Sequence, residues 1–311
     1  MHPGTPSRHE LAGVVFRPPR ALGVIVGGAL AVWAGIIAGL AANVAIGAPA
    51  EPKTLVAWVV AAGMFLLALA FANWTFAVYS LAYHVDDEAL TITWGWRRVV
   101  VPIASIQRMI PGRTIDEPRV DGLNWWGLHV GVADVTRVGY TMVYSTHSTP
   151  DELLYIVTSD ASYAITVIDQ AAFAEEIQAR AIVGASPTVP QRAVATGLAA
   201  LPIWRDRQAV ITAAVSAAAC IVLAAYVVVR YPGLPDVVQL DFPSLGTVAR
   251  FSDKGELLRI AYLGVGVLAV NTLIGVTVHA RERAAGLWLL ASGGMLQAVL
   301  LAAAVVAFER A

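Results

Sequence analysis

The stretch ALGVIVGGALAVWAGIIAGLAANVAIG, residues 21–47, contains no charged side chain. A helix that crosses a bilayer needs about 20 consecutive, mostly apolar residues, so this segment is long enough to span. It is also longer than the apolar part of a removable signal peptide, which has roughly 7–15 residues. A polar arm with four prolines, residues 1–20, precedes it. The stretch therefore predicts a first transmembrane helix that is retained.

Four further apolar runs follow along the chain, at residues 54–79, 209–229, 257–278 and 284–308. The whole chain is 58% hydrophobic and 14% charged, whereas soluble domains have about 25% charged residues. We therefore expect a polytopic α-helical membrane protein with about five transmembrane helices. The predicted parts are a polar arm (1–20), a transmembrane hairpin (21–80), a soluble domain (81–184), a linker (185–207) and three transmembrane helices (208–311) with an outer segment (231–256).

The charges near the ends of the spans predict the orientation. The net charge is −1, which gives no overall field for nucleic acid. If the N-terminus is inside, eight arginines face the cytoplasm and six basic residues face outward. The inner set is Arg8, Arg17, Arg20, Arg192, Arg205, Arg207, Arg281 and Arg283, and the outer set is Lys53, Arg230, Arg250, Lys254, Arg259 and Arg310. Because cytoplasmic loops carry the basic excess, we expect the N-terminus and the soluble domain in the cytoplasm.

The soluble domain shows the pattern of a β-rich fold. Apolar side chains alternate with threonines from Leu90 to Trp94, as in half-buried strands. Residues 153–158 and 163–167 are separated by a short polar turn, which predicts a hairpin, and residues 127–135 and 140–145 are a second candidate pair. Asp169 stands where a helix N-cap would precede residues 171–183. These signals predict a small inserted β-barrel closed by a C-terminal helix.

Residues 79–183 resemble the bacterial pleckstrin-homology-like (PH-like) domains. The resemblance lies in YHVDDEALTITWGWRRVVVPIASIQRM, DGLNWWGLHVGVADVTRVGYTMVYST, LLYIVTSDASYAITVIDQ and AAFAEEI. It implies a PH-like fold in a bacterial, membrane-tethered protein. Residues 84–184 contain seven arginines and thirteen carboxylates, which gives a net charge of 7 − 13 = −6. That sign disfavours a phosphoinositide-type headgroup as ligand and favours protein contacts, although a small basic pocket from Arg97, Arg98, Arg108 and Arg113 stays open.

Residues 234–308 resemble the C-terminal part of SdpI-type immunity proteins and related membrane domains of unknown function. The resemblance lies in LPDVVQLDFPSLGTVARFSDKGELLRI, followed by Asn271 and the turn Arg281-Glu282-Arg283. That family commonly has a histidine before the phenylalanine, where this chain has Asp241. The resemblance implies a binding segment on the outer face, with Asp241, Phe242 and Arg250 as candidate contacts.

Two features are candidate contact surfaces. Small residues recur every four positions along the first span, at Gly23, Gly27, Ala31, Gly35 and Gly39, and this spacing lets another helix approach closely. The partner helix can belong to this chain or to another one, and chance in a Gly/Ala-rich helix is the alternative. The adjacent Trp125 and Trp126 are candidate partner contacts, together with Arg97 and Arg98. Since neighbours in a strand point to opposite faces, we expect one indole inside and one outside.

No residue pattern predicts chemistry. Cys220 is the only cysteine, the histidines lack metal-ligand spacing, and no glycine-rich phosphate loop is present. We expect Asn73, Asn271, Ser292 and Gln297, the polar residues inside the spans, to form interhelical hydrogen bonds. The absence of ionisable residues in the middle of the spans argues against a proton-coupled transporter or pump. We therefore expect no enzyme activity, cofactor or metal, and hypothesise a scaffold or accessory subunit that binds other membrane subunits in the bacterial inner membrane. The alternative is an SdpI-like immunity or ligand-sensing protein.

Overall fold

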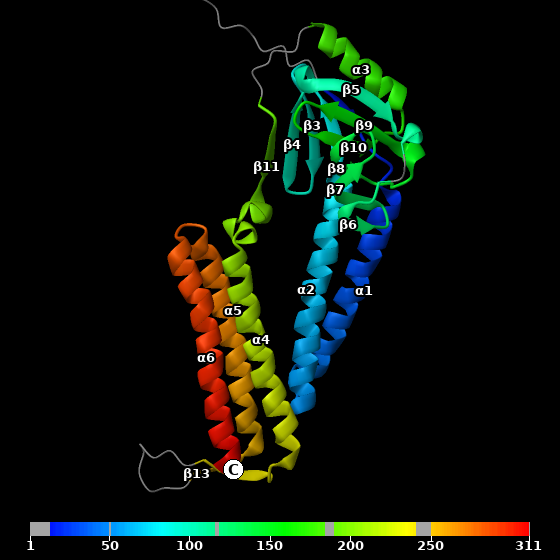
Figure 1. Cartoon of the computed structure of the whole chain (residues 1–311). Helices are drawn as coiled ribbons and strands as arrows, with labels where there is room; N and C mark the ends of the chain where they lie inside the picture. The colour runs from blue at the N-terminus through cyan, green and yellow to red at the C-terminus, as the bar shows by residue number, and fades with distance from the viewer. Residues whose placement is uncertain (1–12, 50, 116–117, 184–189, 241–249, 311) are drawn as a thin grey trace, which may run out of the picture. The chain divides into compact units, whose positions relative to one another are not determined.

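A computed structural model describes residues 13–49, 51–115, 118–183, 190–240 and 250–310 of the chain (Figure 1). The α-helices in these residues are α1 (Ala21–Ala45), α2 (Pro52–Ser80), α3 (Gln170–Val183), α4 (Arg207–Arg230), α5 (Arg259–His279) and α6 (Arg283–Arg310). All but α3 are long and apolar enough to cross a membrane. The five long apolar helices that the sequence predicts are confirmed.

The strands fall into three sheets. The first has the order β1-β2-β3-β4-β11, the second β5-β9-β10-β8-β7-β6, and the third pairs β12 with β13. The strands are β1 (Val14–Phe16), β2 (Ala82–Val85), β3 (Ala89–Trp94), β4 (Arg97–Pro102), β5 (Ile106–Pro111), β6 (Asp121–Trp125), β7 (Leu128–Val135), β8 (Gly139–Ser145), β9 (Leu153–Thr158), β10 (Ser162–Thr166), β11 (Arg192–Ala195), β12 (Val237–Leu240) and β13 (Arg250–Asp253).

The first two sheets and α3 make up the β-rich domain. The predicted hairpin is β9–β10, in which Tyr163 lies opposite Ile156, and the second predicted pair is β7–β8. Asp169 caps α3, because its Oδ1 accepts the Ala172 N–H at 2.9 Å. The two sheets are not closed by hydrogen bonds into one barrel, so that detail of the prediction is not confirmed.

Segments outside the predicted domain extend the first sheet at both edges. β1, from the N-terminal arm, pairs antiparallel with β2. β11, from the predicted linker, pairs antiparallel with β4. Added strands satisfy backbone groups that an edge strand would otherwise expose. Only Arg17, Pro18, Pro19 and Arg20 separate β1 from α1, so the first helix is tied directly to the domain.

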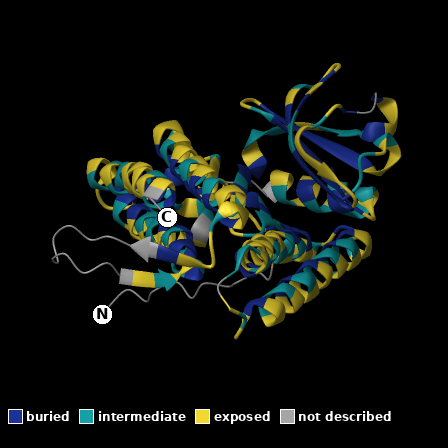
Figure 2. Ribbon diagram, turned by 90° about the horizontal axis from the view of Figure 1, so that it is seen from below, coloured by how far each residue is buried: buried dark blue, intermediate teal, exposed yellow. Residues whose placement is uncertain are grey.

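The core of the domain lies between the sheets and α3. It contains apolar side chains of both sheets together with Phe173 and Ile177 of α3, and Figure 2 shows it as dark blue ribbon. Tyr83 joins the two sheets, since its hydroxyl donates to the Tyr144 carbonyl at 2.8 Å and accepts the Thr166 N–H at 3.2 Å. Burial raises the pKa of Tyr83 well above its ordinary value.

Helices α4, α5 and α6 pack together around a second apolar core. This core includes Leu223, Val227, Leu257, Ala304 and Phe308, and Leu55 of α2 joins it. Inside the spans Ser216 Oγ donates to the Leu290 carbonyl at 2.8 Å. Gln297 Nε2 donates to the Gly264 carbonyl at 2.7 Å. These interhelical bonds satisfy polar groups that lipid could not.

The chain divides into two compact units. One contains Met1–Gly35 and Leu66–Ala200, and the other contains Ile36–Phe65 and Leu201–Ala311. The division passes through α1 and α2, so each of these helices contributes a segment to both units. The five predicted parts of the chain stay a prediction, because this division follows packing and not the path through a bilayer.

Candidate functional site

Two turns of the β-rich domain lie against the C-terminal part of α2. Trp96, in the β3–β4 turn, donates its indole N–H to Asn73 Oδ1 at 3.2 Å. Its ring also packs on Phe76, with centroids 5.0 Å apart. Trp125, the last residue of β6 before the β6–β7 turn, meets Trp74 edge-on, with ring centroids 5.1 Å apart. Aromatic residues of α2 therefore hold the tips of both hairpins.

Trp125 and Trp126 are both exposed, at 44% and 67%. The prediction that one indole is buried is wrong. The reason is local, because β6 ends at Trp125 and Trp126 already lies in the turn. Gly127 has a φ of +73°, which breaks the strand alternation on which the prediction depended. The two rings meet edge-on at 6.3 Å and form one continuous aromatic surface.

Gly127 also brings the turn onto the first turn of α1. A Cβ added at Gly127 would lie 2.5 Å from the backbone nitrogen of Gly23, and one added at Gly23 would lie 2.8 Å from the Gly127 carbonyl oxygen. This approach of two backbones requires glycine at both positions, because a side chain at either one would clash with the backbone of the other. Sequence reasoning singled out Gly23 for contact with a helix, whereas its closest neighbour is a β-turn.

The remaining small residues of α1 divide into two groups. Gly27 faces Thr75 of α2, with 2.5 Å between an added Cβ and Thr75 Oγ1, and Ala31 is half-buried. An added Cβ at Gly35 or Gly39 would meet no described atom within 4 Å, and both residues are exposed. The stripe thus has a part used within the chain and an open part, Gly35–Gly39. Binding of another protein there stays a prediction.

The predicted arginine contacts are exposed at the start of β4. The Arg97 guanidinium lies over the Trp94 ring, 5.2 Å from its centroid, and Arg98 lies opposite Val194 of β11. Arg113, by contrast, lines a groove with the carboxylates of Asp151, Glu152 and Asp169. Carboxylates beside Arg113 leave no local basic surplus there for a phosphate group.

The outer segment is described in part. Asp241 and Phe242 lie outside the described residues. Arg250 is the first residue of β13, where its backbone lies opposite Leu240 of β12, and its side chain is not described. The contacts predicted for these three residues stay predictions.

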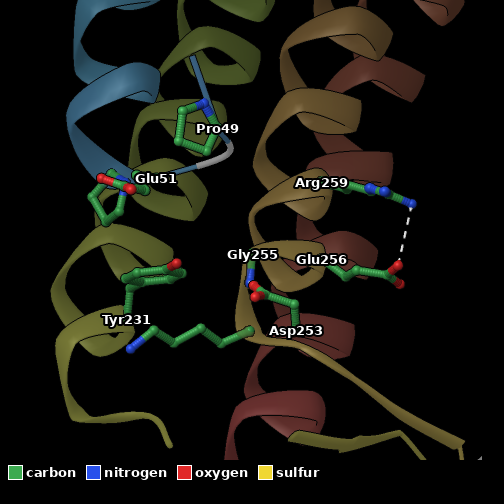
Figure 3. A pocket seen from close by; sticks show the side chains of 9 residues that line it. Pro49, Glu51, Tyr231, Asp253, Gly255, Glu256 and Arg259 are labelled. Atoms are coloured by element: carbon green, nitrogen blue, oxygen red, sulfur yellow. Dashed lines mark hydrogen bonds and ion pairs between the residues drawn. The ribbon is translucent and has the colours of Figure 1, made fainter. Parts of the chain in front are cut away.

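A cavity of about 650 Å³ lies beside this segment, in the unit that contains α4–α6 (Figure 3). Acidic and basic side chains line it, among them Glu51, Asp253, Lys254 and Arg259. The Lys254 ammonium lies 5.4 Å from the centroid of the Tyr231 ring and 2.8 Å from Asp236 Oδ1. This ion pair lowers the pKa of Asp236. The cavity offers paired charges and an aromatic wall to a small polar ligand.

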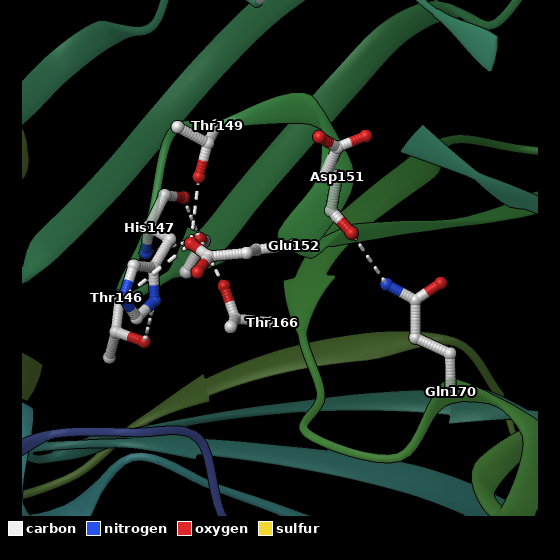
Figure 4. A network of polar contacts seen from close by, with 8 residues as sticks. Thr146, His147, Thr149, Asp151, Glu152, Thr166 and Gln170 are labelled. Atoms are coloured by element: carbon white, nitrogen blue, oxygen red, sulfur yellow. Dashed lines mark hydrogen bonds and ion pairs between the residues drawn. The ribbon is translucent and has the colours of Figure 1, made fainter. Parts of the chain in front are cut away.

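A polar network lies at the β8–β9 connection (Figure 4). Glu152 Oε2 accepts the Thr149 hydroxyl at 2.7 Å and lies 3.5 Å from His147 Nε2. Ser145 and Thr166 share a buried hydroxyl–hydroxyl bond of 2.6 Å. Each contact joins neighbouring loops or strands, so the network shapes this connection. No group of three or more His, Cys, Asp or Glu residues in the described part of the chain could hold a metal.

A charged cluster that sequence reasoning missed lies where α4 begins. Asp206 caps α4 by accepting the Gln208 N–H at 3.1 Å. Its Oδ2 accepts from Arg283 Nε at 2.6 Å and lies 3.5 Å from Nε2 of the buried His279. The hydrogen bond from Arg283 lowers the pKa of Asp206. The signal was Asp206, a residue type favoured at N-caps, three residues before the apolar run 209–229, and its partners lie about seventy residues further on.

The family comparison agrees with the topology of the β-rich domain. Residues 81–181 match the family model of the bacterial PH domain. They run from β2 into α3, so the segment is hereafter called the PH domain. Neither the curated proteins nor the solved structures contain a match to the chain. The likeness of the C-terminal helices to SdpI-type domains therefore stays a prediction.

Proposed function

We propose that the protein is a non-catalytic scaffold or accessory subunit that binds other membrane proteins in a bacterial inner membrane. The observation that carries the proposal is the open Gly35–Gly39 pair of α1, where an added Cβ meets no described atom. A G-x-x-x-G spacing in an apolar helix lets a second helix pack backbone to backbone. Gly23 and Gly27, by contrast, are already occupied within the chain.

The PH domain offers a second contact surface. β6 is the last strand of the six-stranded sheet, and all five of its residues are exposed. An edge strand presents unpaired backbone groups to which an extended segment of another protein can add. The two edges of the other sheet are the short strands β1 and β11, both added from outside residues 81–181. We place the PH domain in the cytoplasm, following the basic excess near the inner span ends.

Co-purification tests this function. The full chain with a C-terminal tag is extracted from native membranes in mild detergent, and the captured proteins are identified by mass spectrometry. A stoichiometric set of membrane proteins is the expected result. A protein that elutes alone and monomeric would contradict the proposal.

The charged cavity beside β13 favours one alternative, an immunity or ligand-sensing function. It opens next to the segment that resembles SdpI-type proteins and is lined by Tyr231, Asp253 and Lys254. Under this alternative, substitutions of Asp241, Phe242 and Arg250 weaken protection in cells challenged with a toxin. Unchanged protection in all three variants would exclude it.

A further inference from the structure

The β3–β4 and β6–β7 hairpins contact α2 well before the last residue of that helix. Asn73 and Trp74, which contact Trp96 and Trp125, precede the last residue of α2, Ser80, by seven and six residues. At 1.5 Å per residue, these contacts lie about 10 Å along the helix from its end.

The length of α2 places this level at the boundary of a bilayer. Its 29 residues give a helix of about 43 Å, while the hydrocarbon core is about 30 Å thick. For a helix along the bilayer normal, roughly 13 Å of α2 therefore lies in the headgroup layers, shared between its two ends. Contacts about 10 Å from one end fall at or close to the edge of the hydrocarbon.

Helix α1 gives a second contact near the same end of α2, since a Cβ added at Gly23 would also lie 3.0 Å from Cγ1 of Val78, two residues before that end. Gly127, in the β6–β7 turn, touches Gly23, which is the third residue of α1. Arg20 immediately precedes α1, and no charged residue follows it in the helix. The hydrocarbon can therefore begin within the first turn of α1, beside the β6–β7 turn.

The side chains at this level have the composition of a membrane interface. Trp96 is 42% exposed and joins Trp125 and Trp126. Tyr79, which is 58% exposed, lies five residues, about 8 Å, nearer the end of α2 than Trp74. The Arg20 guanidinium stacks on the Tyr79 ring, 4.5 Å from its centroid. Tryptophan and tyrosine are enriched where bilayer meets water, because one part of the ring is apolar and the other polar.

We propose that the β3–β4 and β6–β7 turns insert Trp96, Trp125 and Trp126 into the interfacial layer of the bilayer that α1 and α2 span. The PH domain is thereby held on the membrane surface by its own turns, and its orientation over the helices is fixed. The occupant of the exposed aromatic surface is lipid. This inference rests on the membrane placement in the proposed function, and is independent of any protein partner.

No particular headgroup is required. Arg20, Arg97 and Arg98 lie near the two turns. Asp151 and Glu152, however, lie just before Leu153, at the end of the six-stranded sheet that also carries the β6–β7 turn. Because both signs of charge occur at this end, we expect a zwitterionic lipid to suffice.

The test measures depth at single labelled positions in the purified full chain. Cys220 is replaced by alanine, and one cysteine is introduced at Trp126, Thr136 or Leu66 to carry a fluorophore. Thr136 lies in the turn at the opposite end of β7, an eight-residue strand, about 27 Å from Trp126. Leu66 is an exposed residue inside α2 and reports whether this helix is in lipid. Phosphatidylcholine nanodiscs are the membrane. Lipids brominated near the headgroup are the lipid-side quenchers for Trp126 and Thr136, lipids brominated near the ends of the acyl chains are the quenchers for Leu66, and iodide is the aqueous quencher.

The expected result is that the label at Trp126 is quenched by brominated lipid and is several-fold less accessible to iodide than the label at Thr136. Equal iodide access at the two positions would overturn the inference and leave partner binding untouched. A label at Trp126 that is shielded from both quenchers would also overturn it, because protein would then cover the tip. If brominated lipid does not quench the label at Leu66, the membrane placement is overturned, and this inference with it.

A second variant is needed because the label at position 126 replaces Trp126 itself, one of the side chains proposed to insert into the bilayer. In unlabelled protein, Trp126→Phe should lower the share of tryptophan fluorescence that brominated lipid quenches. An unchanged quenched share would contradict the insertion of Trp126.

Discussion

Gly23 and Gly127 touch backbone to backbone, and this contact joins the first turn of α1 to the β6–β7 turn of the PH domain. A Cβ added at Gly127 would lie 2.5 Å from the Gly23 nitrogen, closer than any side chain can be accommodated without a shift of backbone. Strand β1, which leads into α1, and Trp96, which contacts α2, add to this contact, so the PH domain packs directly on the first two helices.

Gly127→Ala should therefore destabilise the protein more than a control with the same backbone conformation. Gly139 also has a positive φ, +80°, but no described atom lies within 4 Å of its added Cβ. Gly139→Ala should cost about 1–2 kcal/mol from backbone strain alone. Gly127→Ala adds the separation of two backbones, and the midpoint of thermal unfolding in detergent should fall further. Equal midpoints would show that the contact with α1 is absent.

The tight α5–α6 connection predicts a second pair of variants. A Cβ added at Gly286 would lie 2.5 Å from His279 Cβ and 2.6 Å from its Cα, whereas one at Gly293 would have its nearest neighbour at 3.5 Å. Gly286→Ala should lower stability by about 1–3 kcal/mol, the usual cost of overpacking. Gly293→Ala, in the same helix, should be close to neutral. Thermal unfolding of both variants checks the prediction, and a neutral Gly286→Ala would refute the packing of this turn.

Asp206 predicts a pH dependence. The Arg283 hydrogen bond lowers the pKa of this carboxyl, so the folded state is stabilised at pH values above the unfolded pKa, about 3.9. That stabilisation is lost as the pH falls through the lower folded pKa. Asp206→Asn keeps an N-cap for α4 but loses the charge. Its apparent melting temperature should therefore be lower than the parent's at pH 7, and the gap should shrink as the pH falls below about 4. A gap that does not change with pH would mean that the charge of Asp206 contributes nothing.

The proposed orientation predicts which loops face outward. Lys53 precedes the apolar run of α2, and Arg281 lies in the α5–α6 turn. In a background with Cys220→Ala, Lys53→Cys should react with a membrane-impermeant maleimide in intact cells. Arg281→Cys should react only after the cells are broken. The reverse pattern would place the PH domain outside the cytoplasm.

Local patterns predicted the elements that depend on near neighbours. The β9–β10 hairpin has a short polar turn, and Asp169 caps the helix that directly follows it. The five long helices follow from uninterrupted apolar runs. In each case the decisive residues lie within a few positions of one another, so a short window of sequence contains the information.

Features that depend on distant pairing were missed. Val14–Phe16 and Arg192–Ala195 become strands only because each meets an edge of the first sheet, at Tyr83 and at Val99 respectively. A strand of three or four residues has no periodicity of its own that a sequence could show. Trp126 was misjudged for a related reason, since the end of β6 is set by the turn at Gly127 and not by the tryptophans.

The candidate sites show the same division. The small-residue spacing of α1 was visible in the sequence, yet only the structure separates Gly23 and Gly27, which are occupied, from Gly35 and Gly39, which are open. The Asp206–Arg283 pair joins residues 77 positions apart. No local signal connects them, because the pairing depends on how α4 and α6 pack.

The most direct test of the central claim is quantitative co-purification with three versions of the full chain. These are the parent, the double variant Gly35→Leu with Gly39→Leu, and the control Gly63→Leu, which adds one leucine side chain at another open glycine, on α2. The account predicts that the parent and the control capture the same membrane proteins in the same amounts, while the double variant loses most of them. Equal capture by all three versions would contradict the proposal that the open face of α1 binds a partner.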